Sequence, residues 1–175
     1  MPPPAPTRAS AAFSSGAHTL EGEWLNKNGG GAAVVALPPH PQYGGTLDNP
    51  VIEEAAYLLA NRGHPVLKLN YRGVGKSGGA WSGGSGEVDD AVAAAQYALL
   101  ETARPNVIYC GYSFGAWVAL EAAQRIDALR MMILISPPNR MFDFSQLANR
   151  TAFFAVPGAK AEFCDLPALE ARCGA

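Results

Sequence analysis

Charged side chains are scarce in this sequence. They make up 16% of its 175 residues, against about 25% in an average domain. The 13 basic and 15 acidic residues nearly balance, giving a formal net charge of −2. The chain therefore lacks the basic surface that binds nucleic acid or an anionic membrane, and we expect neither partner.

Long apolar runs and cysteines are also few. No uncharged apolar run approaches the roughly 18 residues that a membrane-spanning helix needs. The three cysteines, Cys110, Cys164 and Cys173, form neither a disulfide framework nor a zinc-binding pattern. We expect Cys110 to be a buried core thiol, no metal or other cofactor, and a reducing, cytoplasmic location.

Apolar residues, glycine and proline are plentiful. Hydrophobic residues make up 49% of the chain, which also holds 19 glycines and 14 prolines, a composition typical of one folded domain with many tight turns. Residues 1–17 are rich in proline, alanine and serine and cannot bury enough apolar area alone to offset their ordering entropy. We predict a disordered tail over 1–17 and a domain over 18–175.

Strand and helix patterns alternate from Leu20 onward. We expect strands at 20–25, 32–37, 65–70, 107–110, 129–135 and 151–156, a hairpin turn at 28–31, and helices at 50–62, 87–101, 116–125 and 166–172. Repeated strand-helix-strand units with doubly buried strands predict a three-layer α/β/α fold with a mostly parallel sheet. Ligands bind at the carboxyl ends of the strands in such folds, which directs attention to the loops that follow them.

The strongest functional signal is the segment Gly111-Tyr112-Ser113-Phe114-Gly115. It matches the G-x-S-x-G pattern and lies between an expected strand and an expected helix, as that pattern requires. Such a turn strains the backbone of the serine and exposes its hydroxyl, and the N–H of Phe114 at the helix start would favour an oxyanion. We predict Ser113 as a nucleophile and the Phe114 N–H as an oxyanion donor.

The proline-rich loop at 38–45 follows the strand at 32–37. In this class of fold that loop supplies the second oxyanion donor. Pro41 has no N–H, so Gln42 is the first choice for this donor and Tyr43 the second. His40 is expected to order the loop by hydrogen bonding, and we name His40, Tyr43 and Tyr112 as residues that would contact a substrate.

A third glycine-rich segment, Gly73-Val74-Gly75-Lys76-Ser77, contains the G-K-S end of a phosphate-binding loop. The full motif needs a glycine five positions before Gly75, where Asn70 stands, and a helix directly after the serine. The glycines that follow oppose such a helix. We therefore expect no nucleotide site, and we expect Arg72 to pair with Asp89 or Asp90.

The chain resembles the α/β-hydrolase superfamily, and within it the small lid-less bacterial members related to dienelactone hydrolases. The resemblance rests on Pro39-His40-Pro41 with Gly44-Gly45, on residues 70–77 and on residues 111–116, and it extends from about residue 18 to the C-terminus. It implies an α/β-hydrolase fold that is short at its C-terminus, with Ser113 as the nucleophile.

The other two catalytic residues of the family are not found. Its acid would align with Ala161, so Glu162 or Asp165 would have to replace it. Its histidine would follow the acid, but the histidines of this chain all precede Ser113. We therefore expect that a C-terminal part is missing, that the protein lost catalysis, or that His40 acts as the base.

Two functions remain open from the sequence. The first is a serine hydrolase that acts on a small ester or related acyl compound. The alternative is a non-catalytic α/β-hydrolase-like protein that binds a ligand or a partner chain, because a serine without its base is a weak nucleophile. The oligomeric state is not indicated.

Overall fold

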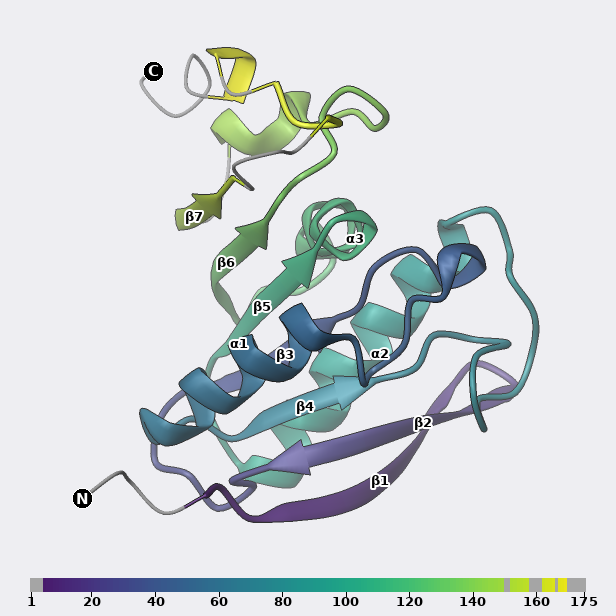
Figure 1. The fold of residues 1–175 in the computed structure, drawn as a ribbon. Helices are drawn as coiled ribbons and strands as arrows, with labels where there is room; N and C mark the ends of the chain where they lie inside the picture. Colours follow the sequence, from purple (N-terminus) through teal and green to yellow (C-terminus); the bar gives the residue numbers. More distant parts are fainter. Residues whose placement is uncertain (1–4, 150–151, 158–161, 166, 170–175) are drawn as a thin grey trace.

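The structure is a computed structural model that describes residues 5–149, 152–157, 162–165 and 167–169. These residues form a seven-stranded sheet in the order β1-β2-β4-β3-β5-β6-β7 (Figure 1). The strands are β1 (Arg8–Ser15), β2 (His18–Leu25), β3 (Ala33–Leu37), β4 (Val66–Leu69), β5 (Val107–Tyr112), β6 (Leu129–Ile135) and β7 (Ala152–Val156). The five strands β4, β3, β5, β6 and β7 run parallel to one another, whereas β2 is antiparallel to β1 and β4. The expected mostly parallel sheet is confirmed.

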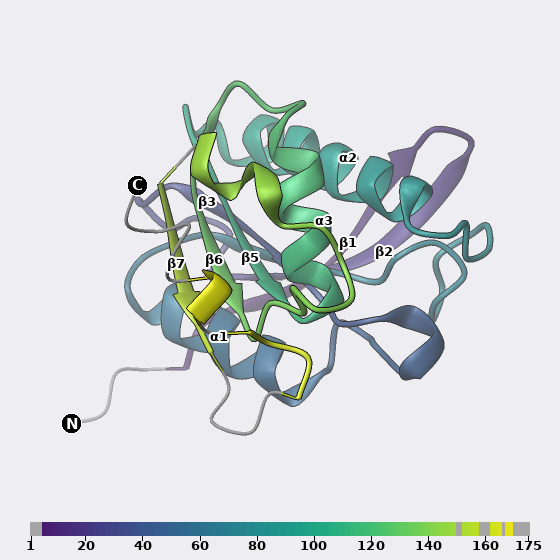
Figure 2. The same ribbon diagram turned by 90° about the horizontal axis from the view of Figure 1, so that it is seen from above.

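Helices cover both faces of the sheet. They are α1 (Pro50–Asn61) on one face and α2 (Ser85–Thr102) and α3 (Phe114–Ala123) on the other (Figure 2). Successive side chains of β3 enter opposite cores, with Val34 on the α1 side and Val35 on the α2 and α3 side. A strand buried on both faces has this pattern, and the expected three-layer α/β/α fold is confirmed.

The first helix begins where its capping residues predict. The Asn49 side chain accepts a hydrogen bond from the Val51 N–H at 3.0 Å, and Pro50 occupies the first turn. Proline suits that position because its missing N–H would have no partner there. Of the helix expected over 166–172, the structure describes only residues 167–169, which are helical.

The N-terminal segment corrects one prediction, because residues 8–15 of the expected tail form β1. This strand pairs with β2 from Arg8 opposite Leu25 to Ser15 opposite His18. Phe13 is buried and stacks on Tyr97 with ring centroids 4.9 Å apart. The composition argument considered only what the segment buries alone, whereas the strand gains its stability from pairing with β2.

The loop at residues 28–31 corrects a second prediction. It was expected to be a hairpin turn, but β2 and β3 are not neighbours because β4 lies between them. The loop instead carries the chain past β4, and a side chain at Gly29 would overlap the carbonyl oxygen of Gly63. The glycine serves this close approach of two loops.

A buried ionic cluster joins the β1–β2 hairpin, α2 and the loop after β4. The Asp90 carboxylate is fully buried and accepts hydrogen bonds from Arg72 Nη2 at 2.8 Å, from the Arg72 backbone N–H at 2.9 Å and from Ser15 Oγ at 2.7 Å. This pairing raises the pKa of Arg72. The predicted Arg72 pair is confirmed with Asp90, whereas Asp89 pairs with Arg125.

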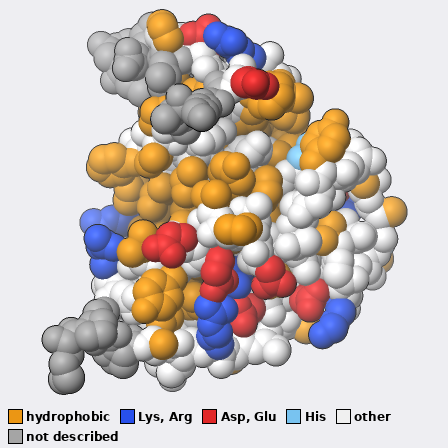
Figure 3. All heavy atoms as spheres, in the orientation of Figure 1, with side chains coloured by type: hydrophobic (Ala, Val, Ile, Leu, Met, Phe, Trp, Pro, Cys, Tyr) orange, Lys and Arg blue, Asp and Glu red, His pale blue; other side chains and the backbone are white. Residues whose placement is uncertain are grey.

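Hydrophobic side chains gather on the α1 face beyond the helix, across β6 and β7 (Figure 3). Ile133 and Ile135 of β6 are partly buried there, and Phe154 of β7, which pairs with Ile133, is 67% exposed. α1 packs on β3, β4 and β5. Among the described residues no element covers this apolar surface.

The cysteine predictions are partly tested. Cys110 is fully buried, as expected, and burial raises its pKa to about 12. Cys164 is a second buried free thiol, and Cys173 lies outside the described residues. The reducing location stays a prediction. In the ranges that the structure describes, no helix combines the length and apolar character needed to cross a membrane.

Candidate active site

Ser113 lies at the turn between β5 and α3. Its backbone has φ 53° and ψ −118°, a left-handed φ that a residue with a Cβ rarely adopts and that costs on the order of 1–3 kcal/mol. Its N–H donates to the carbonyl oxygen of Ile135 at 2.9 Å, which ties the turn to β6. The residue is half-buried. The expected strand, strained serine and helix are all present.

The two glycines beside Ser113 allow the elements to approach closely. A Cβ at Gly111 would overlap the carbonyl oxygen of Gly115, and a Cβ at Gly115 would overlap the carbonyl oxygen of Leu37 at the end of β3. The turn is therefore pressed against the start of the loop that follows β3. This contact brings the two loops named in the sequence analysis together.

The N-terminus of α3 presents free backbone donors at this turn. Phe114 is the first residue of the helix, and the first N–H groups of a helix have no partner within it. They carry the positive end of the helix dipole, which favours a negative oxygen. The Phe114 N–H is therefore suited to the oxyanion role, and its ring is buried beneath the turn.

The loop after β3 directs its N–H groups differently from our prediction. The Gln42 N–H donates to Nδ1 of His40 at 3.2 Å, and the Tyr43 N–H donates to the carbonyl oxygen of His40 at 3.0 Å. Both predicted donors are thus used within the loop. Since Pro41 and its neighbours Pro38 and Pro39 have no N–H, the backbone N–H of His40 is the one left for an oxyanion.

The imidazole of His40 orders the loop, as expected. Burial lowers its pKa, against a weaker opposing effect of the Glu87 carboxylate, so the ring is neutral at pH 7. Because Nδ1 accepts the Gln42 N–H, the proton of the neutral ring is on Nε2. Neither nitrogen is then free to accept a proton, which argues against His40 as the base in this arrangement.

The other two histidines lie away from Ser113. His64 Nδ1 is 2.9 Å from the carbonyl oxygen of Ala32, at the edge of the sheet where β3 and β4 begin. His18 begins β2, which β4 and β3 separate from β5, a span of about 14 Å at the usual strand spacing. None of the three histidines of this chain is therefore placed as the base for Ser113.

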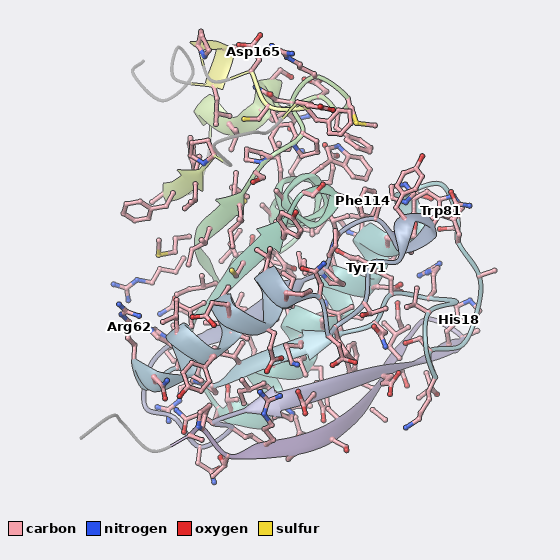
Figure 4. All side chains as sticks on the ribbon, viewed as in Figure 1. His18, Arg62, Tyr71, Trp81, Phe114 and Asp165 are labelled. Atoms are coloured by element: carbon pink, nitrogen blue, oxygen red, sulfur yellow. The ribbon has the colours of Figure 1, made fainter. Side chains whose placement is uncertain are left out.

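The two acid candidates have structural contacts. Asp165 accepts a hydrogen bond from the Ala168 N–H at 3.1 Å, and its backbone forms two hydrogen bonds with the Asn139 side chain. Glu162 is exposed, and its carbonyl oxygen accepts from Arg140. Ala161, the family's acid position, lies outside the described residues. Figure 4 shows the labelled Asp165 well apart from the labelled Phe114.

The two tyrosines named as substrate contacts differ in position. Tyr43 is 83% exposed at the tip of the loop after β3. Tyr112 is half-buried at the end of β5 and packs with the core on the α1 side. Tyr43 instead contacts the His40 ring, with ring centroids 4.8 Å apart.

The glycine-rich segment at 73–77 is a structural loop, as expected. The hydroxyl of Ser77 donates to the carbonyl oxygen of Asn70 at 2.8 Å and accepts from the Glu21 N–H at 2.9 Å. The Lys76 side chain is 89% exposed, and the next helix begins only at Ser85. The loop has no helix N-terminus that could hold a phosphate.

An aromatic cluster surrounds Phe114, and the sequence analysis did not predict it. The Phe114 ring centroid lies 4.8 Å from that of His40, 5.4 Å from Trp117, 5.6 Å from Trp81 and 5.7 Å from Phe142. These rings come from α3 and from the loops after β3, β4 and β6. Figure 4 shows the labelled Phe114 and Trp81 near one another at this end of the sheet.

No group of three or more His, Cys, Asp or Glu residues in the described ranges could hold a metal ion. The half-buried serine next to the free backbone N–H groups at the start of α3 is an arrangement suited to nucleophilic attack with backbone stabilisation of an oxyanion. The base for that attack is not among the histidines of this chain.

Known proteins resemble this arrangement. The family model described as the alpha/beta hydrolase fold matches residues 40–164. An uncharacterized protein of Rickettsia prowazekii is 38% identical over 136 residues, which cover 74% of this chain and 56% of that protein. The chain thus spans little more than half the length of this curated relative.

Two solved structures share the fold over most of the chain. One is a protein of Xanthomonas campestris described as an α/β serine hydrolase without a lid, with 26% identity and a TM-score of 0.82, covering 94% of this chain and 77% of that one. The other is an α/β serine hydrolase homologue of Coxiella burnetii, with 25% identity and a TM-score of 0.83, covering 94% and 80%.

Proposed function

The chain belongs to the α/β-hydrolase fold family, and from that premise we propose that it is a serine hydrolase acting on a small ester or related acyl compound. The observation that carries the proposal is the positive φ of Ser113 between β5 and α3. A glycine at this position would relieve the cost of the positive φ, and the strained serine stands directly before the free N–H groups at the start of α3.

In the proposed reaction the Ser113 oxygen bonds to the acyl carbon and its proton passes to solvent water, while the backbone N–H groups of Phe114 and His40 stabilise the oxyanion. The bond from the acyl carbon to the leaving oxygen then breaks, the leaving alcohol takes up a proton, and water cleaves the acyl-serine to release the acid and restore the hydroxyl. His40 replaces Gln42 in this role because the Gln42 N–H is bound to the His40 ring. The base, the acid and the finer kinship with dienelactone hydrolases stay predictions, as do Glu162 as the acid and a cytoplasmic location.

The proposal is tested by treating the protein with a small fluorophosphonate and digesting the product for mass spectrometry. We expect one adduct, on the peptide that contains Ser113, together with measurable hydrolysis of p-nitrophenyl acetate. An adduct on other serines at the same rate would contradict the assignment.

The position of the histidines favours a second candidate, a non-catalytic protein that binds an acyl ligand through the same donors. This candidate predicts that a non-reactive acyl analogue binds while neither labelling at Ser113 nor ester hydrolysis exceeds the rate of a denatured sample. The two assays in the preceding experiment therefore distinguish the candidates.

The oxyanion assignment gives its own prediction. His40 has φ −57°, a value that proline adopts, so His40→Pro removes the N–H without forcing a different φ at that residue. We expect the phosphonylation rate of Ser113 to fall by about 10²–10³-fold, as when one oxyanion donor is lost. The rate is measured by quenched labelling and gel fluorescence.

The matched control is His40→Ala, which removes the ring but keeps the N–H. We expect this variant to retain the rate within a few-fold, and both variants to be compared at equal folded fraction by circular dichroism. Equal losses in both variants would assign the effect to the imidazole and would overturn the backbone role.

A further inference from the structure

Four rings of the aromatic cluster retain exposed surface. Phe114 at its centre is 1% exposed, whereas His40, Trp81, Trp117 and Phe142 are each half-buried. Tyr43, which is 83% exposed, continues the set outward with its centroid 4.8 Å from His40. The outer four rings therefore keep surface that a bound molecule can contact.

These rings stand beside the candidate nucleophile. Trp117 lies in the first turn of α3, the helix that begins directly after Ser113. Phe142 stacks on Trp117 with centroids 4.9 Å apart. Trp81 contacts His40 at 4.5 Å from the other direction. An acyl group bound to Ser113 would therefore have aromatic rings on its α3 side.

We propose that the aromatic rings of His40, Trp81, Trp117 and Phe142 form the acyl-binding surface beside Ser113, and that the preferred substrates are esters with an aromatic acyl group. This inference rests on the proposed hydrolase function for its reaction, but the surface itself is a binding site whether or not Ser113 reacts. Offset and edge-to-face ring contacts add about 0.5–1.5 kcal/mol beyond buried area, which is about 2–10-fold in affinity.

The test compares two neutral ligands of similar size that cannot acylate the protein, 3-phenylpropanamide and 3-cyclohexylpropanamide. Their affinities are measured by ligand-observed NMR titration on the wild-type chain and on Ser113→Ala. We expect the phenyl compound to bind about 2–10-fold more tightly to both proteins. A surface that is merely hydrophobic would bind the cyclohexyl compound at least as well, and that result would overturn the proposal.

Variants locate the binding surface. Trp81→Leu and Trp117→Leu should each reduce the phenyl preference toward 1, whereas Tyr57→Leu on α1 and Phe154→Leu on β7 should leave it unchanged. A loss in the control variants, or no loss in either tryptophan variant, would overturn the assignment. Because the two tryptophans lie on different elements, a folding defect in one variant still leaves the other as a test.

Phenyl preference without labelling of Ser113 would remove the hydrolase function and retain the binding surface, so the two proposals fail separately.

Discussion

Replacing Ser113 by alanine is expected to abolish the fluorophosphonate adduct on its peptide, because the reacting oxygen is lost while the oxyanion donors remain. Hydrolysis of p-nitrophenyl acetate should fall only to the residual rate that those donors support, because a serine and its base act as a unit and no histidine of this chain is placed as the base. Stability should change little or rise slightly. Among the described residues, the Ser113 hydroxyl has no hydrogen-bond partner that the substitution would remove. The strained φ of 53° stays in place in the variant. Quenched labelling measures the rate, and thermal unfolding measures the stability.

The matched control is Ser136→Ala. Ser136 follows β6 as Ser113 follows β5, and its φ of 45° imposes a similar strain. We expect this variant to label within a few-fold of the wild-type rate. If both variants lost labelling equally, the loss would reflect the general geometry of this sheet edge and the nucleophile assignment would be wrong.

The strand-to-helix turn at Ser113 could be predicted from the sequence because the residues that determine it are local. Gly111 and Gly115 bracket Ser113, an apolar strand precedes it and a helix pattern follows, so the backbone of a short segment is over-determined. The start of α1 at Pro50 was predicted for the same reason. Where one segment carries all the information, its conformation follows from residue types and spacing.

The second oxyanion donor could not be predicted in this way. The rule that Pro41 has no N–H left both Gln42 and Tyr43 as candidates, and the choice depended on where each N–H is satisfied. In the structure the Gln42 N–H donates to the His40 ring, and the Tyr43 N–H donates to the His40 carbonyl oxygen. Counting backbone donors in a loop requires its hydrogen bonds, which the sequence of a proline-rich turn does not specify.

Contacts between distant segments account for the remaining differences. β1 is stabilised by β2, and its composition alone resembles a disordered tail. The aromatic cluster joins rings from four segments, and Trp81 and Phe142 are more than 60 positions apart in the sequence. The periodicity of one helix or strand carries no information on contacts between distant segments, because these contacts depend on the order of strands in the sheet.

The largest expected change in stability concerns Asp90. Asp90→Ala should lower the free energy of unfolding by about 3–5 kcal/mol, because it leaves the Arg72 guanidinium, 14% exposed, without the buried carboxylate that binds it. Ser15 and the Arg72 backbone N–H lose their acceptor as well. The loss would be a large part of the 5–15 kcal/mol typical of a domain, and urea unfolding followed by circular dichroism measures it.

The neighbouring residue provides the control, since Asp89 pairs with Arg125 at 2.6 Å on the surface, where both side chains are about half exposed. Asp89→Ala should cost no more than about 1 kcal/mol, because solvent screens exposed pairs. Equal effects of the two substitutions would mean that burial does not distinguish them. Arg72 lies in the loop that carries Trp81. We therefore also expect Asp90→Ala to weaken the binding of 3-phenylpropanamide and Asp89→Ala to leave it unchanged. This result would link the buried ion pair to the geometry of the acyl-binding surface.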